Sequence, residues 1–256
     1  MIDSQFTTPD EIQGLLNELK LKFWAEAFKK DTESLKPDQI GFLCEYLKKW
    51  TQIQLAKRRE DQIATRIRAA KFGKIETIDG FEFIYNESTQ QIQKSYLKLL
   101  NDIDEDHLPS CVFVGHAGLG KTRLARSLGY TACQKNLTVR FTTAAELVNG
   151  LSASLKTLTL ETELNKYRRP QVLIIDELGY VTMDQQASNL FFQVISARHD
   201  QELGTIVTTN LPFGEYNQIF ASDAIAHAIV DRITGSAEVF FLEGKSYRGH
   251  EKRQKK

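Results

Sequence analysis

The chain has 256 residues, of which 26% are charged and 41% hydrophobic, a composition that is ordinary for a soluble globular protein. Its 33 Lys and Arg residues balance its 33 Asp and Glu residues, so nucleic-acid binding would have to come from local clusters rather than from the net charge. No apolar run approaches the roughly 18 residues that a membrane-spanning helix needs, and Met1 is followed by no basic and then apolar signal sequence, so we expect a cytoplasmic location and no membrane partner.

Residues 1–72 carry helical patterns and no strand pattern. The segment Thr8-Pro9-Asp10-Glu11 matches a capping box with proline at the first helical position, so a helix should begin there. Apolar residues at helical spacing continue to Phe28, and a second periodic segment opens at Pro37-Asp38. We therefore predict a small all-helical N-terminal domain over residues 1–72, which would bind DNA or a partner.

The later part of this helical region carries a cluster of basic side chains. The predicted DNA-binding residues are Lys57, Arg58, Arg59, Arg66, Arg68 and Lys71. Phosphate contacts from such residues would give a DNA affinity that is independent of sequence and sensitive to salt. The alternative is a solvated helix face, because charge runs often serve only solubility.

The remainder of the chain predicts a connector over residues 73–109, an α/β domain over 110–248 and a basic tail over 249–256. The connector contains a helix around Gln90–Leu100 and an acidic loop at Asp102–Asp106. From residue 110 onward, short apolar runs alternate with helical patterns, which is typical of a parallel sheet flanked by helices. The expected strands are 111–114, 139–142, 172–175, 205–209 and 239–242, and the expected helices lie around 124–132, 147–155, 190–195 and 224–233.

A phosphate-binding loop follows the first expected strand. Residues 115–122 match G-x-x-x-x-G-K-[ST], a pattern whose glycines let backbone N–H groups converge on an anion at the start of a helix. The residues of this loop are Gly115, His116, Ala117, Gly118, Leu119, Gly120, Lys121 and Thr122. We predict that the loop binds ATP, with Lys121 reaching the β- and γ-phosphates and Thr122 offering its hydroxyl to Mg²⁺.

Two acidic residues end the strand expected at 172–175. Four aliphatic residues followed by Asp176 and Glu177 form a Walker B pattern, about 50 residues after the phosphate loop. Asp176 would hold the Mg²⁺ shell and Glu177 would polarise the attacking water. The alternative is a strand that ends in two solvated acids.

One strand later, Asn210 follows the expected strand at 205–209. Its side chain would sit beside the γ-phosphate and help to place the water, a position that resembles sensor 1 of AAA+ ATPases. An ordinary turn asparagine before Pro212 is the alternative, because Asn favours turns.

Several segments together resemble one family, the IstB-type AAA+ ATPases that are encoded beside IstA-type transposases and are related to the helicase loader DnaC. The segments are Arg66–Phe72, Arg140–Leu147, Asp176–Tyr180, Thr209–Phe213 and Gly244–Arg248. The likeness spans nearly the whole chain. It departs from the family at His116 and Ala117, where two prolines are common.

The resemblance implies a P-loop AAA+ core and an ATP-dependent homo-oligomer that binds and deforms duplex target DNA and stimulates an IstA-type transposase. It implies that Arg232 acts as an arginine finger in trans, since the late helix of AAA+ proteins faces the neighbouring subunit's nucleotide. It also implies that Arg248 approaches the bound nucleotide in a sensor-2-like role. Both arginines could instead be ordinary surface residues.

Two other functions stay open at this point. A DnaC-like replicative helicase loader would share these motifs and would use the helical N-terminus to hold the helicase. A small-molecule kinase would share the phosphate loop, although Glu177 and Asn210 favour the activation of water instead. The scattered acidic residues form no assignable nuclease constellation, so we do not expect the chain to be the transposase itself.

Overall fold

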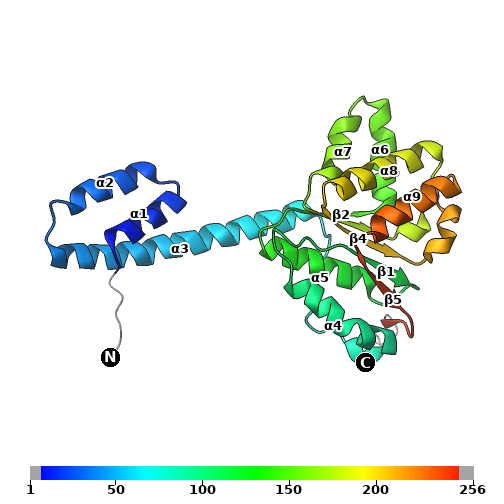
Figure 1. Ribbon diagram of the computed structural model, residues 1–256, viewed down its shortest axis with the longest axis horizontal. Coiled ribbons are helices and arrows are strands. Elements are labelled where there is room, and N and C mark those ends of the chain that lie inside the picture. The colour runs from blue at the N-terminus through cyan, green and yellow to red at the C-terminus, as the bar shows by residue number, and fades with distance from the viewer. Residues whose placement is uncertain (1–6, 248–256) are drawn as a thin grey trace. The chain divides into compact units, whose positions relative to one another are not determined.

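The computed structural model describes residues 7–247, and the chain divides into two compact units, residues 1–64 and 65–256 (Figure 1). The division falls inside the helix α3 (Pro37–Ala70), whereas we expected the boundary after residue 72. No helix of the described residues is both long and apolar enough to cross a membrane.

The first unit is built from α1 (Pro9–Glu18), α2 (Lys22–Thr32) and most of α3. Thr8 caps α1 by accepting a hydrogen bond from the Glu11 backbone N–H at 3.3 Å, with proline in the first turn as the sequence predicts. Lys20 adopts a left-handed φ of 58° and separates α1 from α2. The buried core of the unit consists of Ile12, Leu16, Ala25, Phe28 and Cys44.

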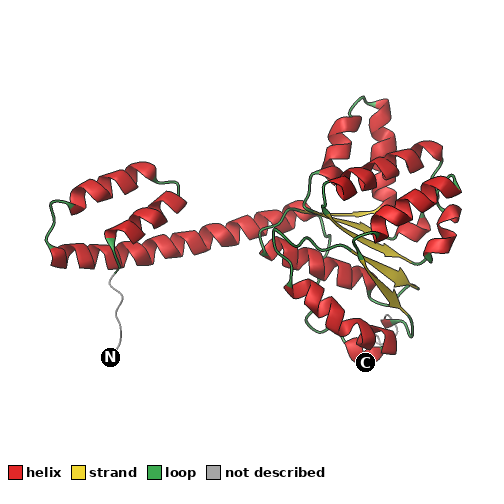
Figure 2. Cartoon of the chain, in the orientation of Figure 1, coloured by secondary structure: helices red, strands yellow, loops and turns green. Residues whose placement is uncertain are grey.

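The second unit contains a five-stranded parallel sheet in the order β2-β3-β4-β1-β5 (Figure 2). The strands are β1 (Cys111–Gly115), β2 (Val139–Thr143), β3 (Val172–Asp176), β4 (Gly204–Thr209) and β5 (Glu238–Leu242). The central strands are buried on both faces, which explains why they stand out in the sequence as continuous apolar runs.

Helices cover both faces of this sheet, so the predicted α/β class is confirmed (Figure 1). One face packs against α4 (Glu87–Asn101) and α5 (Lys121–Gln134). The other face packs against α6 (Ala144–Lys156), α7 (Leu160–Arg168), α8 (Gln185–Asp200) and α9 (Asp223–Thr234). Short 3-10 turns, η1 (Phe83–Tyr85), η2 (Leu178–Tyr180) and η3 (Phe213–Gln218), complete the described elements.

The helix α7 has no counterpart in our sequence analysis. It spans nine residues, and only Leu164 and Tyr167 are buried among charged neighbours. So short an element carries little helical periodicity, and its stability comes from packing against α6 and α8. The parallel arrangement also brings the carboxyl ends of β1, β3 and β4 to one edge of the sheet, where ligands of α/β proteins bind.

Candidate nucleotide-binding site

The phosphate loop connects β1 to α5 in a conformation that two glycines make possible. Gly118 and Gly120 have φ values of 84° and 90°, in the left-handed region that favours glycine. A Cβ atom on Gly118 would lie 2.1 Å from the Ser246 hydroxyl oxygen, and one on Gly120 would lie 2.7 Å from the Phe81 ring. The loop therefore needs glycine at both positions for backbone reasons and for space.

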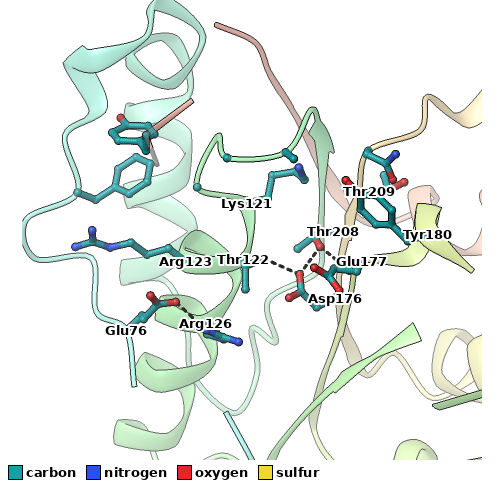
Figure 3. A pocket seen from close by; sticks show the side chains of 16 residues that line it. Glu76, Lys121, Thr122, Arg123, Arg126, Asp176, Glu177, Tyr180, Thr208 and Thr209 are labelled. Carbon is teal, nitrogen blue, oxygen red and sulfur yellow. Dashed lines mark hydrogen bonds and ion pairs between the residues drawn. The ribbon is translucent and has the colours of Figure 1, made fainter. Parts of the chain in front are cut away.

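Lys121 and Thr122 are the first two residues of α5. Their side chains point toward the loop and the strand ends (Figure 3). The Lys121 ammonium donates hydrogen bonds to the carbonyl oxygens of Gly115 at 2.6 Å and His116 at 2.7 Å. It is thereby held over the loop, at the place where bound phosphates would compete for it. The Thr122 hydroxyl donates to Asp176 Oδ1 at 2.9 Å.

Asp176 is the last residue of β3 and is only 4% exposed. Besides Thr122, its Oδ1 accepts a hydrogen bond from the Thr208 hydroxyl of β4 at 2.5 Å. The Thr208 oxygen in turn accepts from the Glu177 backbone N–H at 3.0 Å. The register of β3 and β4, with Ile175 beside Val207, brings these residues side by side (Figure 3). Thr208 is a positioning residue that our sequence analysis missed.

Glu177 and Asn210 stand at the rim formed by the ends of β3 and β4. Glu177 is exposed and adopts a left-handed φ of 62°, which turns the chain sharply after Asp176. The Asn210 Oδ1 atom is buried and has no hydrogen-bond partner among the described residues. A Cβ on Gly179 would lie 2.1 Å from this oxygen, so Gly179 leaves room for the amide. An unpaired buried acceptor is costly, which indicates a place for a ligand or water.

These residues share one cavity of about 570 Å³, a size that suits a nucleotide. It is lined by Lys121, Thr122, Asp176, Glu177 and Asn210 together with Gly118 and Gly120 of the loop. The structure thus brings most of the predicted ATP-binding and water-activating residues to one cavity. Three loop residues, Gly115, His116 and Leu119, do not line it, and the two arginines are described below.

The opposite wall of the cavity was not predicted. It includes Glu76, Phe81, Arg123, Arg126 and Tyr247. Arg123 donates to the carbonyl oxygens of Asp79 at 2.6 Å and Thr77 at 3.4 Å, which ties the connector to α5. Arg123 and Arg126 could have been inferred from their helical spacing after Thr122. Glu76 and Phe81 could not, because their approach to the loop is a long-range contact.

Glu76 and Arg126 form an ion pair of 3.1 Å in this wall. Burial alone would raise the pKa of the Glu76 carboxyl, but hydrogen bonds from Lys74 and Arg126 outweigh it and lower the pKa. Glu76 is therefore a paired structural acid rather than a proton acceptor at neutral pH.

The donor set beside the loop fits Mg²⁺. The Thr122 hydroxyl and the Asp176 carboxylate are hard oxygen donors, and Mg²⁺ is usually held by one or two such groups plus phosphates and water. Within residues 7–247, no cluster of three or more His, Cys, Asp or Glu side chains forms a closed metal site. A metal held partly by the nucleotide is the arrangement that these residues would support.

The family resemblance assigns nucleotide-site roles to two arginines, Arg232 and Arg248, and the structure describes only the first of them. Arg232 lies on α9 and does not line the cavity. Its guanidinium donates to the Ala228 carbonyl oxygen at 3.1 Å and lies 4.8 Å over the Phe192 ring. Arg248 lies outside the described residues, but the preceding Tyr247 lines the cavity and its backbone N–H donates to the Gly118 carbonyl oxygen at 2.8 Å.

The predicted DNA-binding residues divide equally between the two units. In the first, Lys57 pairs with Asp61 at 3.2 Å and Glu60 at 3.5 Å, and Arg58 donates to the Leu19 carbonyl oxygen at 2.7 Å. Arg59 is exposed and makes no hydrogen bond or ion pair with the described residues.

In the second unit, Arg66 donates to Asn136 Oδ1 at 2.7 Å, and Arg68 donates to the Thr65 hydroxyl oxygen at 3.4 Å. Lys71 is exposed at a left-handed φ of 61°. Arg58 and Arg66 are thus partly engaged in holding the fold, whereas Arg59 and Lys71 are more available for phosphate contacts.

Comparison with known proteins places this geometry in context. The model of a family described as IstB-like ATP binding protein matches residues 14–255. The chain is 32% identical to an ATP-binding protein of insertion sequence IS5376 from Geobacillus stearothermophilus, covering 95% of this chain and 96% of that one. It is 31% identical to the corresponding protein of IS232 from Bacillus thuringiensis subsp. berliner, covering 91% and 92%.

Solved structures show the fold. The DnaC helicase loader matches with a TM-score of 0.58 at 19% identity, over 65% of this chain and 96% of that one. DnaA from Aquifex aeolicus, bound to AMPPCP, matches with a TM-score of 0.56 at 18% identity, over 70% of this chain and 54% of that one. The second unit therefore has the P-loop AAA+ fold.

Proposed function

Because the chain belongs to the family of IstB-like ATP binding proteins, we propose that it is a Mg²⁺-dependent ATPase that assembles on duplex target DNA and stimulates an IstA-type transposase. The observation that carries the ATPase part is the Asp176 carboxylate, which accepts hydrogen bonds from both Thr122 of the phosphate loop and Thr208 of β4. These contacts support the proposal, because they hold Asp176 beside the phosphate loop and the strand-end Glu177 at one cavity.

The residues around the cavity divide the work of hydrolysis. Loop N–H groups and Lys121 bind the phosphates, and Lys121 exchanges its two carbonyl partners for the β- and γ-phosphates. Thr122 and Asp176 would hold Mg²⁺, which neutralises charge on the phosphates when bound. Glu177 orients the attacking water and accepts its proton. The unpartnered Asn210 Oδ1 accepts a hydrogen bond from the second O–H of that water and fixes its direction.

The two remaining arginines would complete the site. Arg232 is absent from the lining of its own chain's cavity, so its finger role requires the cavity of a neighbouring subunit. Mixing supplies the test, because Arg232→Ala protomers should hydrolyse ATP poorly alone and recover when wild-type neighbours are added. Absence of rescue would count against Arg232. Arg248 would approach the nucleotide from beyond Tyr247, which already lines the cavity.

The DNA part of the proposal rests on the basic residues of α3, on Lys71 directly after it, and on the insertion-sequence context of the relatives. The measurement is retention of duplex DNA at low and moderate salt by wild-type protein with ATP and Mg²⁺, and by the variants Arg59→Ala and Lys71→Ala. We expect weaker DNA binding in both variants. The slope of log affinity against log salt concentration should also become shallower by roughly one unit for each lost phosphate contact. Lys22→Ala, a change in α2, is the charge-matched control.

Strand transfer completes the test. The protein should stimulate an IstA-type transposase on duplex target DNA when ATP is present, and Lys121→Ala should remove the stimulation. If wild-type protein with ATP and Mg²⁺ retains no duplex DNA at low salt, the proposal fails. Release of phosphate without an acceptor substrate would exclude a small-molecule kinase.

A second candidate is a replicative helicase loader, which the match to 96% of the DnaC helicase loader chain favours. The two functions differ in the protein that the chain holds. A pull-down that recovers replicative helicase but no IstA-type transposase would select the loader, and the reverse result would select the transposition function.

A further inference from the structure

A short segment that follows β5 lies against the phosphate loop. This segment, called here the strap, consists of residues 243–247 and runs beside the start of α4 (Figure 1). The Tyr247 backbone N–H donates a hydrogen bond to the Gly118 carbonyl oxygen at 2.8 Å. A Cβ atom on Gly118 would lie 2.1 Å from the Ser246 hydroxyl oxygen, so the loop and the strap are in direct contact at this glycine.

Hydrogen bonds from the start of α4, rather than apolar packing, hold the strap. Its first four residues are exposed. The Asn86 amide nitrogen donates to the Lys245 carbonyl oxygen at 3.0 Å, and Asn86 Oδ1 accepts from the Lys245 N–H at 2.8 Å. The Ser88 hydroxyl makes the same exchange with Glu243, donating to its carbonyl oxygen at 2.6 Å and accepting from its N–H at 2.9 Å. The strap is therefore fixed through its backbone by two side chains that are distant in sequence.

Asn86 makes this long-range contact in place of a local one. It occupies the N-cap position of α4, where an asparagine side chain ordinarily accepts a hydrogen bond from a backbone N–H of the first turn, but here the side chain makes no capping bond. The residue is buried, and a Cβ on Gly244 would lie 2.3 Å from its Oδ1, so the strap needs glycine there. The Asn86 amide therefore specifies where the strap runs, not where the helix begins.

The strap also sets the direction of the peptide group between Gly118 and Leu119. A trans peptide is planar, with its C=O and N–H pointing in opposite directions, and no peptide bond among the described residues is cis. Because Tyr247 holds the Gly118 carbonyl oxygen, the Leu119 N–H is directed away from the strap. Phosphate binding needs N–H donors that converge on the anion, and a carbonyl oxygen turned toward a phosphate would repel it.

We infer that Asn86 is a positioning residue for nucleotide binding, which holds the strap so that the Gly118 carbonyl faces outward and the Leu119 N–H faces the bound phosphates. Asn86 does not line the cavity, so it acts through the strap. The strap engages a carbonyl oxygen of the loop and takes no N–H donor from a phosphate at that contact. It thereby orders the loop before the ligand arrives, which favours binding. This inference rests on the proposed binding of ATP at the cavity.

Titration of the full-length protein with a fluorescent ADP tests the role of Asn86. The variant Asn86→Ser loses both contacts with Lys245 but keeps a favoured N-cap residue, so α4 should stay capped. We expect the dissociation constant for ADP to rise about tenfold through the loss of preorganisation. At saturating ATP, kcat should stay within about twofold of wild type, because Glu177 is unchanged. Asn101→Ser, the same substitution at the exposed last residue of α4, is the matched control and should bind ADP normally.

Competition by inorganic tripolyphosphate separates the phosphates from the base. If the strap orients a phosphate donor, tripolyphosphate should lose affinity for Asn86→Ser by the same factor as ADP. The Tyr247 ring also lines the cavity, and a strap that acted only through this ring would affect the nucleotide base. Normal competition by tripolyphosphate together with weakened ADP binding would therefore overturn the inference.

Two variants at Tyr247 isolate the backbone N–H. Tyr247→Ala removes the ring and keeps the N–H, whereas Tyr247→Pro removes both. We expect the proline variant to bind tripolyphosphate about tenfold more weakly than the alanine variant, as the loss of one hydrogen bond would produce. Equal affinities in the two variants would contradict the assigned role of the N–H.

The remaining outcomes separate this inference from the proposed function. Unchanged ADP affinity in Asn86→Ser would overturn the inference and leave the ATPase proposal standing. Tighter ADP binding in that variant would also overturn it, because the strap would then be a barrier to the nucleotide. An equal loss in Asn101→Ser would reduce the effect to a general one on α4. Wild-type protein that binds neither ADP nor tripolyphosphate would overturn both. Thermal unfolding of the two serine variants shows whether each is folded during the titrations.

Discussion

The two ends of the parallel sheet use their polar side chains in opposite ways. At the amino ends, the fully buried guanidinium of Arg198 donates to the carbonyl oxygens of Tyr167, Pro170, Gln171 and Gly204 and to the Thr205 hydroxyl oxygen. This charge has only neutral partners, and burial lowers its pKa to about 9. Its hydrogen bonds join α8 to the starts of β3 and β4.

At the carboxyl ends, the polar groups are held in position but keep unfilled hydrogen-bonding capacity. Asp176 Oδ1 accepts two hydroxyl donors, Asn210 Oδ1 has no partner among residues 7–247, and Glu177 is exposed at the rim. A buried group whose bonding capacity is filled belongs to the scaffold. Polar groups that are held in place with unfilled hydrogen-bonding capacity indicate a ligand-binding site, because a ligand supplies the missing partners. Substitutions at the two ends should therefore separate stability from chemistry.

The largest effect is expected for Glu177→Gln at the carboxyl end. The amide keeps the shape of the side chain but cannot accept a proton, so ATP turnover should fall by about 10³-fold. Nucleotide affinity and the free energy of unfolding should stay close to wild type. Steady-state phosphate release and fluorescent-nucleotide titration measure the two quantities, and normal turnover would refute the role of Glu177 as the base.

Next in size is Arg198→Met at the amino end. Methionine fills part of the volume but leaves the four carbonyl oxygens short of donors, which should lower the free energy of unfolding by about 3 kcal/mol. Urea denaturation measures this loss. The fraction that remains folded should bind ATP with wild-type affinity, and weakened binding without loss of stability would contradict the scaffold role.

Thr208→Val should give a smaller effect, confined to the chemistry. The change removes the hydroxyl that donates to Asp176 and accepts from the Glu177 N–H, while the volume is nearly kept. We expect a loss of about tenfold in kcat, equal to about 1.4 kcal/mol of positioning. Thr208→Ser, which retains the hydroxyl, is the matched control and should restore most of the rate.

The smallest effect is expected for Glu76→Gln, in the cavity wall. The pKa of Glu76 is lowered by Lys74 and Arg126, so its contribution to stability is present above the unfolded pKa near 4.5 and is lost as the pH falls through the lower folded value. The variant should lose up to about 1 kcal/mol at pH 7, the upper value for a partly exposed pair. It should match wild type once the carboxyl is protonated. Thermal unfolding between pH 3 and 7 measures this difference.

The strands and the phosphate loop were accessible from the sequence because their signals are local. Continuous apolar runs predict buried parallel strands, and the order of strand, loop and helix is contained in about 25 residues. The helix α7 was missed because nine residues with two buried side chains carry too little periodicity. The wall formed by Glu76 and Phe81 was missed because an irregular connector shows no pattern that would aim it at the loop.

The sequence by itself determined the strands, the family and the residues of the phosphate loop and Walker B strand, since each is a short pattern of residue types. Only the tertiary structure decided which groups share hydrogen bonds. The register of β3 against β4 places Thr208 between Asp176 and Glu177, and packing leaves the Asn210 oxygen without a partner in the described chain. The same holds for the apolar side chains of α3, because helical spacing alone does not say which apolar face of this helix is covered by α1 and α2.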